Sequence, residues 1–271
     1  MTMMRASSQS QKIEGLTKEF PEAVVQLDRE LEAAPQNAGL WFQRAALLGE
    51  ERLMRDALDS LSRAIALDPF CGIYYRWRGH RHLNLAEIPE ASADLTVASR
   101  LIPENWDVWY HLGLTHVLLG NYELAELAYR KCAFVTSERA SNCIPLANWS
   151  YLALMHQGKT EQAQQVLRGI PDDMTTQDYN SGYLEMINFY KGRLSESDML
   201  DIRPDLDESA RKERIFDVCT HAFGMANHFY TTGNKKRYAE LIDYILELGQ
   251  EAAWNCFAFA GAYYTKTYRN M

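Results

Sequence analysis

One 34-residue spacing recurs through the middle of the chain and constrains its fold more than any other feature. The unit is repeated three times without a gap between residues 38 and 139, and Trp41, Tyr75 and Trp109 mark the same place in each copy. Further rows keep the interval: Ala45, Gly79 and Gly113; Ala57, Ala91 and Ala125; Leu61, Leu95 and Tyr129; Ala64, Ala98 and Cys132. A period shared by so many positions indicates a repeat array.

Each unit is predicted to fold as two antiparallel helices. First helices are expected over 41–49, 75–85 and 109–119. The small residue at the unit's eighth position lets the second helix approach closely. Pro69 and Pro103 close the first two units, because proline ends a helix. Each pair is apolar over more surface than it covers alone, so the units must stack.

This pattern resembles the tetratricopeptide repeat family. Over residues 38–139, Trp or Tyr, Gly or Ala, Ala, Leu or Tyr, Ala or Cys, and Pro occupy the family's signature positions. The chain departs from the family at the seventh position, where Arg44 and Arg78 replace the usual leucine. A packed arginine needs an acidic or carbonyl partner. The resemblance implies an all-α fold, a right-handed α-solenoid, and the chain is similar to bacterial members without an assigned function.

The remaining sequence divides around the three units. Residues 1–13 are polar and are expected to form a disordered tail. Apolar residues at helical spacing predict an N-terminal capping helix within 14–36. Residues 37–139 hold the three regular repeats. Residues 140–271 are expected to form divergent tetratricopeptide-like repeats and a C-terminal helix, after a looser insertion at 138–141.

Composition narrows the classes of partner. With 28 basic and 36 acidic residues the net charge is −8, which disfavours nucleic acid as a partner. No stretch approaches the ~18 apolar residues of a membrane span, and residues 1–15 lack the apolar core of a signal peptide. The five cysteines form no CxxC pair, which is typical of reduced thiols. We therefore expect a cytoplasmic protein with no membrane contact.

The last helix, expected from 251 to about 267, is apolar nearly all round. Terminal repeats usually present a polar outer face. One interpretation, which we favour, is that this helix packs into the groove of the preceding pair and is mostly covered. The other is that its bare face forms a homodimer or partner surface.

The family resemblance implies that a ligand lies in the concave groove, lined by set positions of the first helices. Mapped by register, this lining is apolar and aromatic with scattered amide, imidazole and guanidinium groups, which suits a peptide or protein segment. The candidate peptide-binding residues are Arg76, His80, Asn84, Asp107, Tyr110, Leu114, Asn148, His156, Tyr190, Asn227 and Tyr230. For any single aromatic residue, packing between units is the commoner role.

Three arginines on the second unit, Arg76, Arg78 and Arg81, have two interpretations. The favoured one is a structural network with Asp94, Asp107 or neighbouring carboxylates, with Arg81 stacked on a tryptophan as a cation–π pair. The second is a site for an acidic peptide. The Lys and Asn clamp with which some family members hold a C-terminal carboxylate is absent at the corresponding positions.

Motifs for catalysis or metal binding are also absent from the sequence. It contains no HExxH, no paired cysteines, no GxGxxG, no GxxxxGK[ST] and no GxSxG. We therefore expect no metal, no cofactor, and a non-catalytic adaptor or scaffold for a protein or peptide partner. The alternative is an enzyme or small-molecule sensor with a pocket closed by the divergent C-terminal half. For it the sequence offers only His80, Asp107, His111 and His156.

Overall fold

The computed structural model describes residues 20–135, 142–176, 180–252 and 256–269, and these fold as helices without a strand. After α1 (Glu22–Ala33) come three regular pairs: α2 (Ala38–Glu50) with α3 (Met54–Leu67), α4 (Gly72–Asn84) with α5 (Ile88–Leu101), and α6 (Trp106–Leu119) with α7 (Tyr122–Phe134). The later pairs are α8 (Cys143–His156) with α9 (Thr160–Arg168), α10 (Ser181–Tyr190) with α11 (Glu196–Leu200), and α12 (Glu208–Thr231) with α13 (Lys235–Ala252). The chain closes with α14 (Phe257–Tyr264) and a short π-helix, η2 (Thr265–Arg269). The predicted α-solenoid is confirmed.

The repeated aromatic residue has the same structural role in the first and third units. The indole N–H of Trp41 donates to the carbonyl of Pro35 at 3.0 Å, and that of Trp109 donates to Pro103 at 2.7 Å. Each bond ties the start of a first helix to the turn before it. The sequence markers therefore lie in equivalent places.

The small eighth position of each unit is required by close packing. A Cβ at Gly79 would lie 2.8 Å from Leu95, and a Cβ at Gly113 would overlap the ring of Tyr129. Both neighbours are buried side chains of the second helix. The residue type at this position thus sets how near the two helices of a unit lie.

The two arginines that replace leucine have the predicted acidic partners. Arg44 Nε donates to Asp28 on α1 at 2.6 Å, and its Nη1 donates to Ser60 on α3 at 2.8 Å. One unit later, Arg78 donates through two nitrogens to both carboxylate oxygens of Asp94 on α5, each at 2.7 Å. Two-pronged pairing of this kind fixes orientation as well as charge.

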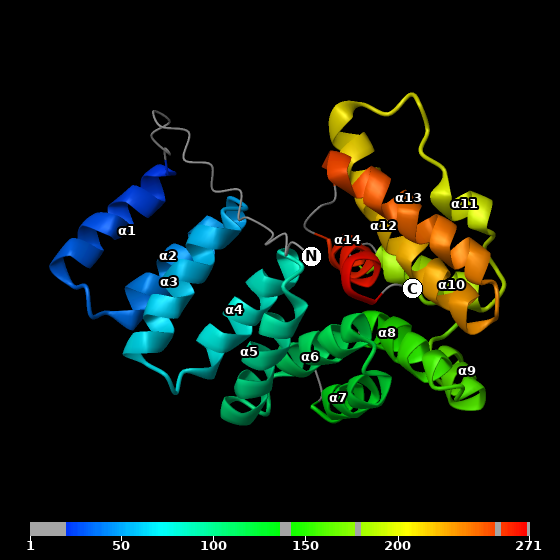
Figure 1. The fold of residues 1–271 in the computed structure, drawn as a ribbon, viewed down its shortest axis with the longest axis horizontal. Coiled ribbons are helices and arrows are strands. Elements are labelled where there is room, and N and C mark those ends of the chain that lie inside the picture. The colour runs from blue at the N-terminus through cyan, green and yellow to red at the C-terminus, as the bar shows by residue number, and fades with distance from the viewer. Residues whose placement is uncertain (1–19, 136–141, 177–179, 253–255, 270–271) are drawn as a thin grey trace, which may run out of the picture.

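The helix pairs follow one another along a curve, and α14 lies on its inside (Figure 1). α14 packs against α4 of the second unit and against α12 and α13 near the end of the chain. It therefore bridges parts of the solenoid that lie far apart in the sequence. Within the described residues, no helix combines the length and apolar character needed to cross a membrane.

The prediction of one last helix from 251 to about 267 is wrong in its bounds. Positions 251 and 252 end α13, and a separate helix begins at Phe257, where the sulfur of Cys256 accepts a hydrogen bond from the amide of Phe259 at 3.2 Å. A Cβ at Gly249 would overlap the ring of Phe259, so α14 folds back onto α13. Because apolar residues occur both at 252–254 and at 257–264, the hydrophobic pattern did not reveal the break.

The favoured interpretation of that helix, that it is mostly covered, is confirmed. Ala258, Ala260, Gly261 and Ala262 are buried, whereas Tyr263 stays 44% exposed. The homodimer or partner surface on this helix stays a prediction. The predicted tail at 1–13 and the insertion at 138–141 fall outside the described residues.

Candidate ligand-binding surface

The candidate site is the inner surface of the curve. We define it as the residues of α4, α6, α8 and α12 that contact α14, together with the residues that neighbour them. First helices contribute most of it, as the repeat register predicts. Its described part has three regions: an imidazole cluster at the start of α14, a close contact at its middle, and an arginine anchor at its end.

At the start of α14, the ring of Phe257 lies against two histidines. Its centroid is 5.6 Å from that of His80 on α4 and 5.8 Å from that of His111 on α6, in edge-to-face geometry. The two imidazoles are themselves 4.8 Å apart. Burial lowers the pKa of both histidines well below its usual range, and Arg76 lowers each further. Both rings are therefore neutral at pH 7 and suit an aromatic neighbour.

Beside this cluster, Arg76 forms an ion pair with Asp107. Asp107 also approaches His111, with its carboxylate 3.2 Å from Nδ1, while the Nδ1–H of His111 donates to the Asp107 carbonyl at 2.8 Å. Burial, and then repulsion by Arg81, lowers the pKa of Arg76 to about 10. Arg76 remains charged at pH 7, and its carboxylate partner offsets the cost of burial.

The favoured structural interpretation of the arginine cluster is confirmed for two of its members, since Arg76 pairs with Asp107 and Arg78 with Asp94. The guanidinium carbon of Arg81 lies 5.2 Å from the ring centre of Trp77, which is the predicted cation–π pair. Arg81 is only 9% exposed, and its Nε has no hydrogen-bond partner among the described residues.

At the middle of α14, Gly261 permits close contact with two elements at once. A Cβ at this position would lie 2.7 Å from the ring of Phe223 on α12 and 2.8 Å from Leu118 on α6. Both neighbours are themselves buried. No larger residue fits here without movement of α14.

The chain beyond α14 is anchored by charged groups. Arg269 donates to the hydroxyl of Tyr122 at 3.4 Å, and its guanidinium carbon lies 5.9 Å from the centre of the same ring. Lys266 pairs with Asp243 on α13 at 2.7 Å. The C-terminal segment is thus held to α7 of the third unit and to α13 near the end of the chain.

A second group of polar and aromatic side chains surrounds His156, beside Tyr122. The ring of His156 stacks on that of Tyr122 with centroids 4.0 Å apart, and its Nε2–H donates to Asn227 at 2.8 Å. Tyr230 lies 5.5 Å from the same imidazole. Burial lowers the pKa of His156 to about 4, although the bond to Asn227 opposes the shift.

The structure therefore brings the predicted site residues together in two groups. Arg76, His80 and Asp107 form one, and His156, Asn227 and Tyr230 form the other. The rest lie in packing positions: Tyr110 accepts from the indole N–H of Trp149, Tyr190 stacks on Tyr151, and Leu114, Asn84 and Asn148 are buried. Register mapping missed Phe257, Gly261 and Arg269, because they belong to no repeat. The continuous apolar run at 257–264 was the signal that could have indicated the first two.

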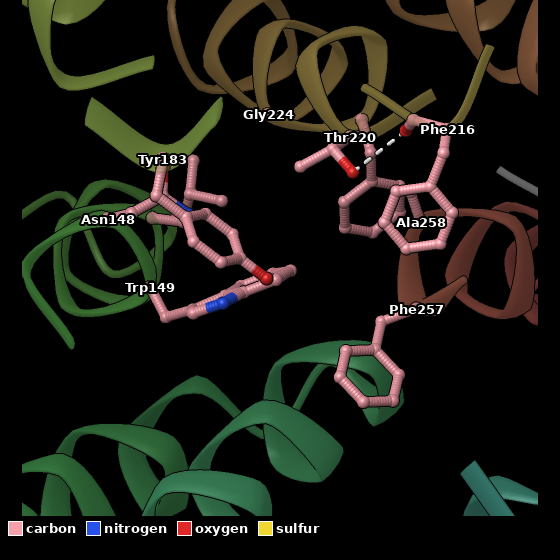
Figure 2. A pocket seen from close by; sticks show the side chains of 10 residues that line it. Asn148, Trp149, Tyr183, Phe216, Thr220, Gly224, Phe257 and Ala258 are labelled. Atoms are coloured by element: carbon pink, nitrogen blue, oxygen red, sulfur yellow. Dashed lines mark hydrogen bonds between the residues drawn. The ribbon is translucent and has the colours of Figure 1, made fainter. Parts of the chain in front are cut away.

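A small cavity of about 30 Å³ remains where α14 meets α8, α10 and α12. Figure 2 shows Phe257 and Ala258 across it from Asn148, Trp149 and Tyr183. This volume accommodates a single water molecule. The side-chain oxygen of Asn148 is buried without a hydrogen-bond partner among the described residues. The packing of α14 on the inner surface is therefore incomplete at this point.

A larger cavity of about 620 Å³ lies elsewhere, between α7, α8 and α9. Its lining mixes apolar residues such as Leu146, Val166 and Ile170 with polar ones such as Arg130 and Gln165. The size is within the range of small-molecule sites. None of the predicted site residues line it.

Comparison with known proteins identifies similar helical repeats. The family model described as "Tetratricopeptide repeat" matches residues 107–133. The curated protein anaphase-promoting complex subunit 3 of Schizosaccharomyces pombe is 27% identical over 103 residues, 38% of this chain. The chain spans only 16% of that relative's length.

Two solved structures are similar in fold. A crystal structure of MamA aligns with a TM-score of 0.51 at 22% identity, covering 64% of this chain and 90% of that one. A tetratricopeptide repeat protein from Parabacteroides merdae aligns with a TM-score of 0.57 at 15% identity, covering 89% and 91%. At these identities the likeness is one of fold alone.

Proposed function

The chain is a tetratricopeptide repeat protein, and we propose that it is a non-catalytic adaptor that binds a segment of another protein on the inner surface of its solenoid. Repeat solenoids present an extended concave surface, and their fold is used for protein–protein interaction generally. The finer assignment, to the inner surface and to a protein segment, rests on the side chains described below.

The observation that carries the proposal is a row of aromatic and cationic side chains on α2 and α4. Phe42 meets Trp77 edge to face with ring centroids 5.2 Å apart, and the guanidinium carbon of Arg81 lies 5.2 Å from the centre of the Trp77 ring. Phe42 and Trp77 are only partly buried. Aromatic and arginine side chains are those that most often dominate binding energy at protein interfaces.

Arg81 also favours a partner segment with acidic residues. Its guanidinium lies against Gly49, in the last turn of α2, where the negative end of the helix dipole stabilises a cation. The nearby Glu50 carboxylate opposes the lowering of the Arg81 pKa by burial, but among the described residues no carboxylate lies within ion-pair distance of Arg81. An acidic side chain on the partner would supply that counter-charge. This narrows the acidic-peptide hypothesis from the three arginines to Arg81, since Arg76 and Arg78 are already paired.

A peptide array probed with the full chain tests the proposal. Peptides bound by the wild type should lose about ten-fold in affinity with Trp77→Ala or Arg81→Gln, the size expected for a single dominant contact. Phe70→Ala is the matched control, since Phe70 is 82% exposed in the turn before α4. Binding that survives both substitutions, or is weakened equally by Phe70→Ala, would contradict the proposed site.

A second candidate function, small-molecule sensing, is favoured by the cavity between α7, α8 and α9. The space beside α14 is too small for such a ligand, so the outer cavity is the better location. Compounds that raise the melting temperature of the wild type should fail to do so with Ser150→Trp, which places an indole in that cavity. Stabilisation that persists with Ser150→Trp would exclude this cavity as their site.

A further inference from the structure

The segment α14–η2 lies on the inner surface in the way a bound helical ligand would. We infer that this surface is a helix-binding site, that its partner is a protein segment with the chemistry of α14, and that α14 is the tethered competitor which the partner displaces. The inference rests on the proposed function and names the class of ligand.

The contacts of α14 define what such a helix must carry. Phe257, Gly261 and Thr265 are each four residues apart on one side of the helix; Gly261 and Thr265 are buried and Phe257 is half-buried. The alanines at 258, 260 and 262 are buried as well. The surface therefore accepts an aromatic residue at the first turn, seated on two neutral imidazoles, followed by small residues. A basic residue just beyond the helix matches the hydroxyl and ring of Tyr122.

Small residues are essential because the surface is deep at its centre. Phe223 and Leu118 leave no space for a side chain at Gly261. Helices that pack through small residues approach closely and gain contact along their backbone. Recognition would thus be of the helix-in-groove kind, read through residues three and four apart.

Two features make α14 a displaceable occupant. The helical segment is short, since the eight residues of α14 and the five of η2 make thirteen, and isolated helices below about 12–15 residues are marginal in water. Its fit is also incomplete, since the cavity of about 30 Å³ and the oxygen of Asn148 remain at its N-terminal end. A partner helix that fills this cavity makes contacts that α14 lacks. Against this, the tether gives α14 an effective concentration on the order of mM.

A labelled peptide of residues 257–269, added to the full chain, tests the inference. The wild type should bind it weakly, because the tethered copy competes. Gly261→Leu in the full chain should unseat α14 and raise affinity for the peptide at least ten-fold. Tyr263→Leu is the matched control on the exposed side of the same helix and should behave as the wild type.

Alkylation of Cys256 provides a readout that a purely structural helix would not change. Cys256 is 2% exposed while α14 is seated, and Cys132 in the third unit is fully buried away from it. Excess peptide should speed alkylation of Cys256 in the wild type, measured by mass spectrometry, and leave Cys132 unchanged. No gain at Cys256 with saturating peptide would overturn the inference.

Folding of the variant is checked by circular dichroism. Where Gly261→Leu loses helicity, the double variant Phe257→Ala with Arg269→Ala replaces it, since it removes contacts without adding bulk. A folded variant of either kind that binds the peptide no better than the wild type would also overturn the inference. If binding of the array peptides still depends on Trp77, the proposed function would then hold without this inference. If that dependence is also absent, the proposed function would fail as well.

Discussion

The ring of Phe257, the first residue of α14, lies 5.6 Å from the imidazole of His80 on α4. This contact joins the final helix of the chain to the second repeat unit. It places a hydrophobic side chain on a histidine that burial keeps neutral. The inner surface is consequently covered by α14 at this point, and the histidine beneath Phe257 carries no charge. Trp77, on the same helix as His80, stays only partly buried.

Stability should fall as the pH drops from 7.5 to 5. The folded-state pKa of His80, His111 and His156 is lowered, to about 4 for His156, while unfolded histidine titrates near 6.5. Between these values the unfolded chain binds more protons, so the free energy of unfolding decreases as the pH falls below about 6.5. For His156 the loss by pH 5 would be about 2 kcal/mol, at about 1.4 kcal/mol per pKa unit.

Urea denaturation at several pH values measures this loss. His156→Gln should flatten the profile, because the amide does not titrate in this range. The carboxylates with lowered pKa, such as Glu87 and Glu126, titrate only below the histidine window and would contribute at more acid pH. A free energy of unfolding that is constant between pH 7.5 and 5 would contradict buried neutral histidines.

The Arg78–Asp94 pair should be strongly coupled. Asp94 is 8% and Arg78 24% exposed in their side chains. Arg78→Leu alone restores the family's residue but strands a buried carboxylate, and it should cost about 3 kcal/mol. Arg78→Leu combined with Asp94→Ala should cost clearly less. A double variant whose loss equals the sum of the losses for Arg78→Leu and Asp94→Ala alone, by chemical denaturation, would show that the pair is not coupled.

The size of the eighth position should be matched to its neighbour on the second helix. The first unit combines Ala45 with Leu61 and the second Gly79 with Leu95, whereas the third combines Gly113 with Tyr129, whose ring a Cβ at Gly113 would overlap. Gly113→Ala should lower stability by about 1–3 kcal/mol. Adding Tyr129→Leu recreates the pairing of the first unit and should recover part of the loss. A double variant less stable than Gly113→Ala alone would refute the matched-pair explanation.

Repeat periodicity predicted most of the fold, because packing between units requires the same residue types at each turn of the solenoid. The period also foretold that Arg44 and Arg78 need acidic partners. Asp94 was among the partners expected for the second unit, but the exchange between units was not foreseen. Arg44 uses Asp28 and Ser60, while Arg78 uses Asp94 and Ser62, so carboxylate and hydroxyl exchange places. Each arginine thus bonds a residue 16 positions before it and one 16 positions after it, but the carboxylate precedes Arg44 and follows Arg78.

The candidate site was less predictable for a physical reason. Register assigns residues to the inner surface of each unit, but it does not show what covers that surface. The pairing of Arg76 with Asp107 was among those expected, whereas the contact of His80 and His111 with α14 depends on how the later, degenerate units curve. A run such as 257–264 is equally apolar whether it is covered by its own solenoid, a second copy or a partner. Only the three-dimensional arrangement distinguishes these.

Hydrogen exchange across residues 256–269 tests the central claim most directly, because amides of a seated helix exchange slowly and those of a released one quickly. We predict slow exchange in the wild-type chain alone, and faster exchange in this segment, but not in α4 or α6, when the unlabelled peptide of residues 257–269 is added in excess. Rapid exchange of the segment in the chain alone, as fast as in the free peptide, would contradict the account.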